Sequence, residues 1–121
     1  MPAIPTFMLK RLYVTRSLIN TDDGFQTSIR NTLAPGTIVG LGPVTVDDSV
    51  YDATVITVQM GNEDRPAAEI TPDAPLRFSM NSTAVLRIKA ASLLAGTHRL
   101  SIVTMTREAG ELQIEATDTI G

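Results

Sequence analysis

The chain has 121 residues, which suffices for one domain and is too short for two. Its formal net charge of -3 argues against a strongly basic nucleic-acid-binding protein, and its 43% apolar residues argue against a disordered chain. The absence of cysteine excludes disulfides and thiolate chemistry, and the single histidine, His98, excludes metal sites with two histidine ligands.

The first seven residues carry no basic segment and no long apolar core, so they do not resemble a signal peptide. We expect residues 1–7 to be a disordered lead. No apolar run approaches the roughly 20 residues that a membrane helix requires. We therefore expect a cytoplasmic protein with no membrane partner, although the missing cysteines alone say little about location.

Val, Ile and Thr make up 35 of the 121 residues, which favours strands over helices. Clusters of Gly, Pro, Asn and Asp divide the chain into runs of roughly 5–10 residues, the usual length of a strand. Several runs alternate between apolar and polar residues, as in half-buried antiparallel strands. The apolar members of these runs are Phe25 and Ile29, Leu86 and Ile88, Leu100 and Ile102, and Leu112 and Ile114.

This spacing predicts an all-β fold over residues 8–120. We expect one antiparallel β-sandwich of seven to eight strands, immunoglobulin-like or jelly-roll-like. The only helix we expect is one short turn at 90–94, because no stretch of 11 residues shows a helical stripe.

The segment from Gly36 to Pro43 is apolar, although its glycines and proline are typical of a surface loop. Such a segment either packs under the sandwich as a bulged strand or offers an apolar patch to another chain, and the sequence favours neither. We expect this region to form a partner interface, with Ile38, Val39 and Leu41 as apolar anchors. The candidate interface residues are Pro35, Gly36, Ile38, Val39, Gly40, Leu41, Gly42 and Pro43.

His98 is the residue most suited to acid–base catalysis. The simpler interpretation places it on a strand after a glycine turn, hydrogen-bonded to a neighbouring loop, and we favour that one. Catalysis within this chain would require His98 to meet an acid such as Asp47 or Glu115 in one pocket.

Other motifs that carry chemistry are absent. The acids Asp22, Asp23, Asp47, Asp48 and Asp52 lack the alternating spacing of a calcium loop, so we interpret them as solvated turn residues. The glycines from Gly36 to Gly42 lack the Lys and Ser/Thr of a phosphate-binding loop, and no nucleophile elbow occurs. The eight arginines are dispersed along the chain. We expect no catalytic residue, cofactor or metal in this chain, and no nucleic-acid partner.

Four segments carry a resemblance to known proteins. The chain resembles a family of short prokaryotic proteins to which the name hydroxymethylglutaryl-CoA reductase has been given. That reaction needs a dinucleotide site and a Lys/Asp/His catalytic set, and the sequence contains neither. The segments are Leu9–Val14 (LKRLYV), Asn31–Ile38 (NTLAPGTI), Gly40–Asp47 (GLGPVTVD) and Leu94–His98 (LAGTH).

The order of elements over residues 9–120 also resembles the small β subunit of C-glycoside deglycosidases. The shared features are a glycine-containing apolar segment before a Val-Thr-Val-Asp strand and a late Leu-x-x-Gly-x-His strand. The resemblance implies a β-sandwich that pairs with a larger (β/α)-barrel subunit of the sugar isomerase/epimerase type. It further implies that the divalent metal and the catalytic residues belong to that partner.

We therefore expect an accessory, non-catalytic subunit of a sugar-processing lyase that docks to a barrel subunit. A self-associating structural sandwich without an enzymatic role is the alternative, because the same patch or an edge strand can pair two copies. A stand-alone enzyme that uses His98 ranks third.

Overall fold

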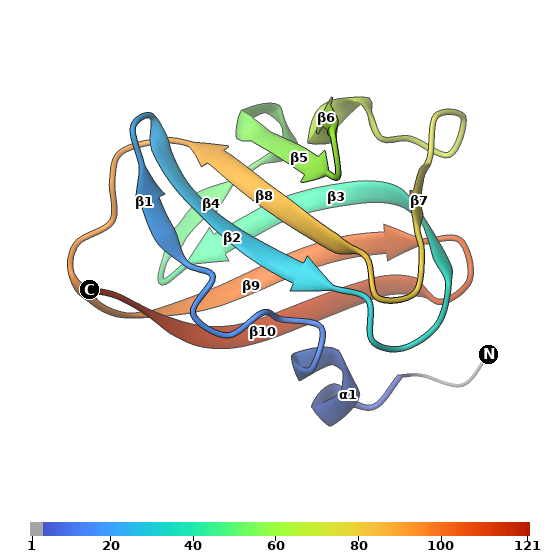
Figure 1. The fold of residues 1–121 in the computed structure, drawn as a ribbon, viewed down its shortest axis with the longest axis horizontal. Helices are drawn as coiled ribbons and strands as arrows, with labels where there is room; N and C mark the ends of the chain where they lie inside the picture. Colours follow the sequence, from blue (N-terminus) through green and yellow to red (C-terminus); the bar gives the residue numbers. More distant parts are fainter. Residues whose placement is uncertain (1–3) are drawn as a thin grey trace.

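The computed structural model describes residues 4–121, and it confirms the predicted all-β antiparallel sandwich (Figure 1). Two five-stranded sheets face each other. The first sheet has the order β1–β2–β8–β5–β6. Its strands are β1 (Ile19–Thr21), β2 (Gly24–Arg30), β8 (Thr83–Lys89), β5 (Ile56–Met60) and β6 (Glu63–Pro66).

The second sheet has the order β10–β9–β3–β4, and β7 also pairs with β3. Its long strands have 11 residues each. The strands are β10 (Gly110–Ile120), β9 (Gly96–Thr106), β3 (Gly36–Val46), β4 (Ser49–Tyr51) and β7 (Leu76–Phe78). The short 3-10 turns η1 (Ala53–Val55) and η2 (Ala67–Glu69) lie against β3.

The described residues form ten strands, whereas the sequence predicted seven or eight. Four of the ten strands are short: β1, β4 and β7 have three residues each, and β6 has four. Three or four residues span at most two cycles of alternation, which are too few to recognise a strand period in a sequence.

The core lies between the two sheets and is made by the predicted alternating side chains. Ile29 and Leu86 from the first sheet and Ile102 from the second are fully buried. The ring of Phe25 meets Tyr51 edge-on, with ring centroids 5.2 Å apart, so an aromatic pair joins β2 to β4 across the core.

β3 carries two irregularities that place its apolar side chains in the core. Its pairing with β9 shifts register between Ile38 and Gly40 and again between Leu41 and Val44. Each shift inserts an extra residue opposite β9, as in a β-bulge. Ile38, Leu41 and Val44 therefore all face inward, although they lie three residues apart and not two.

The N-terminal part of the chain differs from the prediction. Residues 1–3 of the expected lead lie outside the described residues, but the helix α1 (Thr6–Lys10) includes Thr6 and Phe7. α1 packs beside β10, and the chain after it runs between the two sheets at their open side (Figure 1). Leu12 is buried there, which explains why this segment is ordered against the sandwich.

The predicted helical turn at 90–94 is wrong, because this segment is irregular and not helical. The side chain of Asn20 donates to the carbonyl of Leu93 at 2.9 Å and accepts from its N–H group at 2.9 Å. These two bonds satisfy the N–H and carbonyl groups of Leu93, which a helical turn would pair within the segment itself. Tertiary contact with β1 therefore overrides the local helix propensity.

Candidate functional site

The structure divides the candidate interface segment into a buried part and an accessible part. Ile38 is fully buried and Leu41 is 4% exposed, so both belong to the core. The expectation that these two side chains anchor a partner is corrected: the bulges turn them inward. Between the two interpretations of this segment, the structure supports the bulged strand.

The accessible part of β3 faces the outer side of the second sheet. Gly40 pairs with Met105 of β9, and at the second bulge Gly42 and Pro43 together lie opposite Val103. Met105 is 39% exposed, and Val50 of β4 is 66% exposed. We call Gly40, Pro43, Val50, Val103 and Met105 the β3 face. Only Gly40 and Pro43 of this set were among the candidates from sequence.

The remaining candidates from the sequence are partly accessible: Val39, Gly36 and Gly42 are half-buried, and Pro35 is exposed.

The other residues of the β3 face have no short-range signal in the sequence. Met105, for example, joins the face only because β9 pairs with β3 across more than 60 residues of chain. That pairing follows from topology and not from a local pattern.

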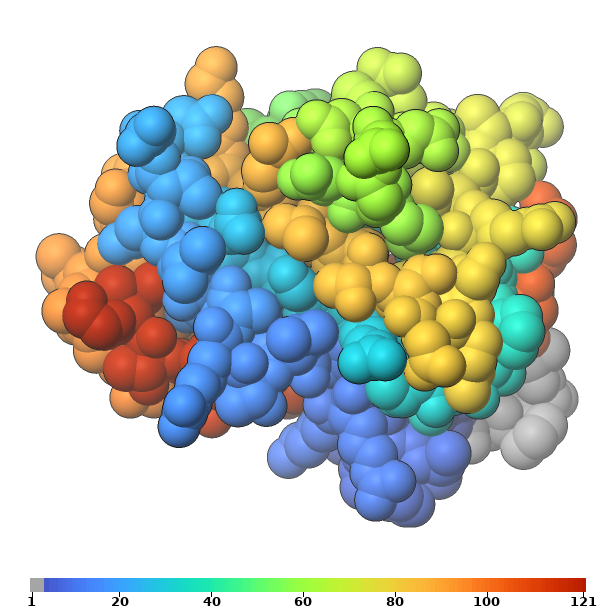
Figure 2. All heavy atoms as spheres, in the orientation of Figure 1, coloured from blue at the N-terminus to red at the C-terminus, as the bar shows by residue number. Residues whose placement is uncertain are grey.

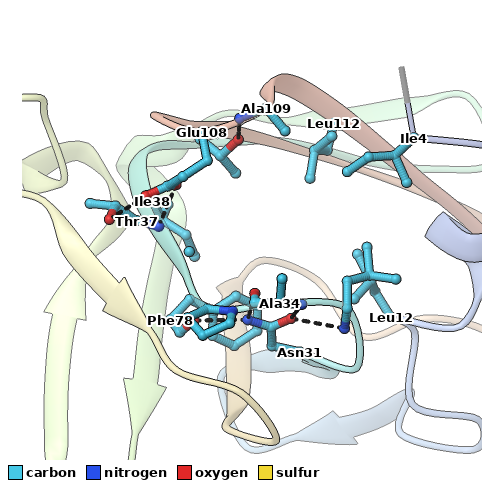
Figure 3. A pocket seen from close by; sticks show the side chains of 14 residues that line it. Ile4, Leu12, Asn31, Ala34, Thr37, Ile38, Phe78, Glu108, Ala109 and Leu112 are labelled. Carbon is cyan, nitrogen blue, oxygen red and sulfur yellow. Dashed lines mark hydrogen bonds between the residues drawn. The ribbon is translucent and has the colours of Figure 1, made fainter. Parts of the chain in front are cut away.

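A second feature is an apolar hollow of about 110 Å³ at one end of the sandwich (Figure 3). It lies where the start of β3 meets the β9–β10 connection and the N-terminal segment. Apolar side chains form most of its wall, including Leu12, Leu33, Ile38, Phe78 and Leu112.

The polar groups around this hollow are already bonded within the protein. Asn31 donates to the carbonyls of Ala34 and Phe78 at 2.7 and 2.8 Å. The Glu108 carboxylate accepts from the Thr37 N–H group at 2.8 Å and from the Thr37 hydroxyl at 2.9 Å. These hydrogen bonds lower the pKa of Glu108, the backbone bond contributing most. The hollow thus offers apolar contact and no free polar group from Asn31 or Glu108.

His98 lies on β9 with its side chain 11% exposed. Its Nδ1 atom is 2.8 Å from Oδ2 of Asp47, and its Nε2 atom is 2.8 Å from the carbonyl oxygen of Leu94. This is the strand position and loop contact that the simpler interpretation of the sequence expected. Both ring nitrogens are engaged in structural bonds, so neither is free to take a proton from a substrate.

Of the two acids considered for catalysis, Asp47 contacts this histidine. Asp47 and Glu115 line one shallow hollow on the outer surface together with Arg99, but the ring of His98 is not part of its wall. The Leu94 carbonyl and then Asp47 raise the pKa of His98. The Arg99 N–H group and then His98 lower the pKa of Asp47.

A buried polar network joins the N-terminal segment to both sheets, and nothing in the sequence indicated it. The Tyr13 hydroxyl donates to Oδ2 of Asp118 at 2.7 Å and accepts from the Thr27 hydroxyl at 2.8 Å. The N–H group of Leu18 also donates to Asp118, at 3.1 Å. The members of this network lie up to 105 residues apart in the sequence, so no local motif could have indicated it.

Asp52 shows the turn role expected for the acidic residues. Its carboxylate accepts from the Thr54 N–H group at 2.9 Å and from the Thr54 hydroxyl at the start of η1. Thr54 therefore lowers the pKa of Asp52. Across residues 4–121 the structure holds no cluster of three or more His, Cys, Asp or Glu side chains suited to a metal ion.

The fold and these surfaces define a β-sandwich module with an accessible sheet face and a small apolar hollow. The chain belongs to the family described as hydroxymethylglutaryl-CoA reductase, N-terminal domain, whose model matches residues 8–121. No curated protein matches the chain. Within the described part of the chain, no helix has the length and apolar character needed to cross a membrane.

Proposed function

We propose that this protein is an accessory, non-catalytic subunit that docks through the β3 face to a larger catalytic subunit. The observation that carries the proposal is the outer side of the second sheet, where Met105 beside Gly40 is 39% exposed and Val50 on the neighbouring β4 is 66% exposed. Glycine lets a partner's backbone approach closely, and exposed apolar side chains supply the buried centre of an interface.

Two further observations support an accessory role. Both ring nitrogens of His98 are engaged by Asp47 and Leu94, so the best candidate base is occupied. The family is described as a domain of an enzyme, which agrees with a chain that works beside other catalytic parts.

The resemblance to the small β subunit of C-glycoside deglycosidases gives the proposal its finer form. The partner is then a cytoplasmic (β/α)-barrel protein of the sugar isomerase/epimerase type, and the complex is a carbon–carbon lyase. The divalent metal and the acid–base groups belong to that partner. This chain stabilises the barrel or shapes its substrate entrance.

The test is co-expression with a barrel protein of this type encoded beside the gene. The variant Met105→Glu places a charge on the β3 face, and Thr119→Glu places one on the outer face of β10 as the matched control. We expect Met105→Glu to lose co-purification and Thr119→Glu to retain it, with both variants folded by circular dichroism. Unchanged co-purification of Met105→Glu would remove the β3 face from the proposal. Leu41→Asp does not serve this test, because Leu41 is a core residue.

A self-associating sandwich is the second candidate, and the edge of the second sheet favours it. β10 has 11 residues and pairs only with β9 within the described residues. A long unpaired edge can add a strand from a second copy. Light scattering on the pure chain separates the candidates, since a monomer favours the accessory subunit. A homo-oligomer that survives Met105→Glu would assign the contact to the β10 edge.

A further inference from the structure

The ring of His98 lies between two hydrogen-bond acceptors that come from different parts of the chain. Nδ1 contacts the carboxylate of Asp47, and Nε2 contacts the carbonyl of Leu94, both at 2.8 Å. A neutral imidazole has one N–H group, whereas the imidazolium has two. Because neither acceptor carries a proton to donate, both bonds form together only when the ring is doubly protonated.

The two acceptors belong to segments that the ring joins. Asp47, in the turn between β3 and β4, is fixed independently, because its N–H group donates to the Arg99 carbonyl at 2.8 Å and its Oδ1 accepts from the Arg99 N–H group at 3.0 Å. Asn20 holds the neighbouring Leu93 through two hydrogen bonds, whatever the protonation state of His98. Beyond this anchor the Leu94 side chain is 82% exposed, and the carbonyl contact with His98 ties Leu94 and Ala95 to the sandwich.

We propose that His98 is a proton-dependent latch that fastens Leu94 and Ala95, at the end of the connection between β8 and β9, to the turn between β3 and β4. With the ring doubly protonated, both bonds form and these two residues are fixed. With the ring neutral, one bond is lost and Leu94 and Ala95 are released, while Leu93 stays bound to Asn20. The inference goes beyond the docking function and does not depend on it.

The charges around the ring favour the protonated state. Asp47 faces it from the β3–β4 turn, and Asp118 is its cross-strand neighbour on β10. Arg99 follows His98 on β9, where alternation directs its side chain to the opposite face. Residues 90–95 carry no charge. The geometry thus agrees with the raised pKa of His98, to which the Leu94 carbonyl contributes first and Asp47 second.

Nitrogen-15 NMR of the whole chain reports the protonation of each ring nitrogen directly. We expect both nitrogens to be protonated at pH 6.5, and the ring to titrate above the ordinary value of about 6.5. We also expect the backbone order parameters of Leu94 and Ala95 to fall as pH rises through that titration, while that of Leu93, held by Asn20, stays unchanged.

Asp47→Asn is the informative variant, because Asn tolerates the left-handed backbone at this position, where φ is 55°, and keeps an acceptor for the Arg99 N–H group. It removes the charge, so the titration of His98 should move toward lower pH. Glu115→Gln removes an exposed acid from the neighbouring hollow and should leave the titration unchanged.

A single protonated nitrogen at pH 6, or order parameters of Leu94 and Ala95 that do not follow the titration, would overturn the latch. The wild-type titration decides the matter even if Asp47→Asn fails to fold. Loss of docking by Met105→Glu has no bearing on this result, so failure of the latch and failure of the proposed function remain distinguishable.

Discussion

The hydroxyl of Tyr13 donates a 2.7 Å hydrogen bond to the carboxylate of Asp118, across 105 residues of sequence. Both side chains are 8% exposed. The bond ties the segment after α1 to the last strand, β10. The N–H groups of Leu18 and Thr119 complete the coordination of the same carboxylate, at 3.1 and 2.8 Å. A buried charge is thus compensated by three donors, as such groups require.

Removing the Tyr13 hydroxyl should destabilise the fold. Tyr13→Phe keeps the ring but leaves the Asp118 carboxylate and the Thr27 hydroxyl short of a partner. We expect a loss of about 1.5–3 kcal/mol in the free energy of unfolding, the usual range for a hydrogen bond to a charged group. Urea denaturation measures it. Tyr51→Phe is the matched control, because the core ring of Tyr51 is retained, and it should change stability by less than about 0.5 kcal/mol. Equal effects of the two variants would contradict the role of the network.

The same pair should shape the dependence of stability on pH. Burial opposes ionisation of Asp118, but the hydrogen bonds from Tyr13 and from backbone N–H groups outweigh it, so the pKa of Asp118 is lowered. Its contribution is present above the unfolded value of about 3.9 and is lost as pH falls through the folded pKa. Asp118→Asn should therefore flatten the decline of stability below about pH 4. If the free energy of unfolding of Asp118→Asn declines at acid pH with the wild-type slope, other carboxylates control that decline.

At the alkaline end Tyr13 should titrate late. Burial, as the largest effect, raises the pKa of Tyr13 to about 12. Because the folded state holds this proton more tightly, stability should fall as pH rises from about 10 toward 12. Ultraviolet difference spectroscopy of wild type and Tyr13→Phe isolates the phenol. A Tyr13 signal that titrates near pH 10 in the folded protein would contradict its burial in the network.

Gly42 should be intolerant of any side chain. Its φ is 113°, and an added Cβ would lie 3.3 Å from the backbone nitrogen of Ala53. Gly42→Ala therefore combines backbone strain with a contact that cannot move aside, and we expect a loss of about 2–3 kcal/mol on thermal or urea unfolding. Gly61→Ala is the control, since Gly61 also has positive φ, at 61°, but no atom within 4 Å of an added Cβ. Gly61→Ala should cost about 1 kcal/mol, so equal losses would exclude the contact with Ala53 as a cause.

Thr104→Val should stabilise the protein. The Thr104 side chain is 3% exposed, and its hydroxyl oxygen is buried without a hydrogen-bond partner among the described residues. Valine has nearly the same shape and removes the unpaired hydroxyl, so we expect a gain of about 1 kcal/mol. Thr106→Val is the contrasting variant, because the Thr106 hydroxyl donates to the Gly110 carbonyl and accepts from the Ala109 N–H group, each at 3.0 Å. A loss of stability in Thr104→Val would show that its hydroxyl is satisfied.

The sequence was informative wherever a strand alternates over several residues. Leu86 and Ile88 of β8, and Leu100 and Ile102 of β9, are buried as their period of two predicts. β8 pairs in regular register with both of its neighbours, and β9 does so with β10, so the pattern of the chain and the geometry of the sheet agree. The face toward the viewer in Figure 2 is formed largely by the N-terminal segment and by the first sheet, to which β8 belongs.

The candidate site was less predictable. Ile38, Leu41 and Val44 show a spacing of three that matches no regular strand, and only the pairing of β3 with β9 reveals the two bulges behind it. Because the sequence does not reveal the bulges, it could not distinguish the buried Ile38 and Leu41 from the accessible Gly40 and Pro43. The Tyr13–Asp118 bond had no local signal at all, because contacts between distant residues depend on the topology of both sheets.

The bulges also determine where the chain can change length. Each one adds a residue that the partner strand does not match, so removing that residue, Val39 at the first bulge or Pro43 at the second, leaves the inward set of side chains as it was. The ladder is regular at Thr45, so a deletion there would instead turn the side chains after it to the opposite face of the sheet. Loss of a single residue within the ladder of β3 with β9 is therefore compatible with the same core at these two bulges.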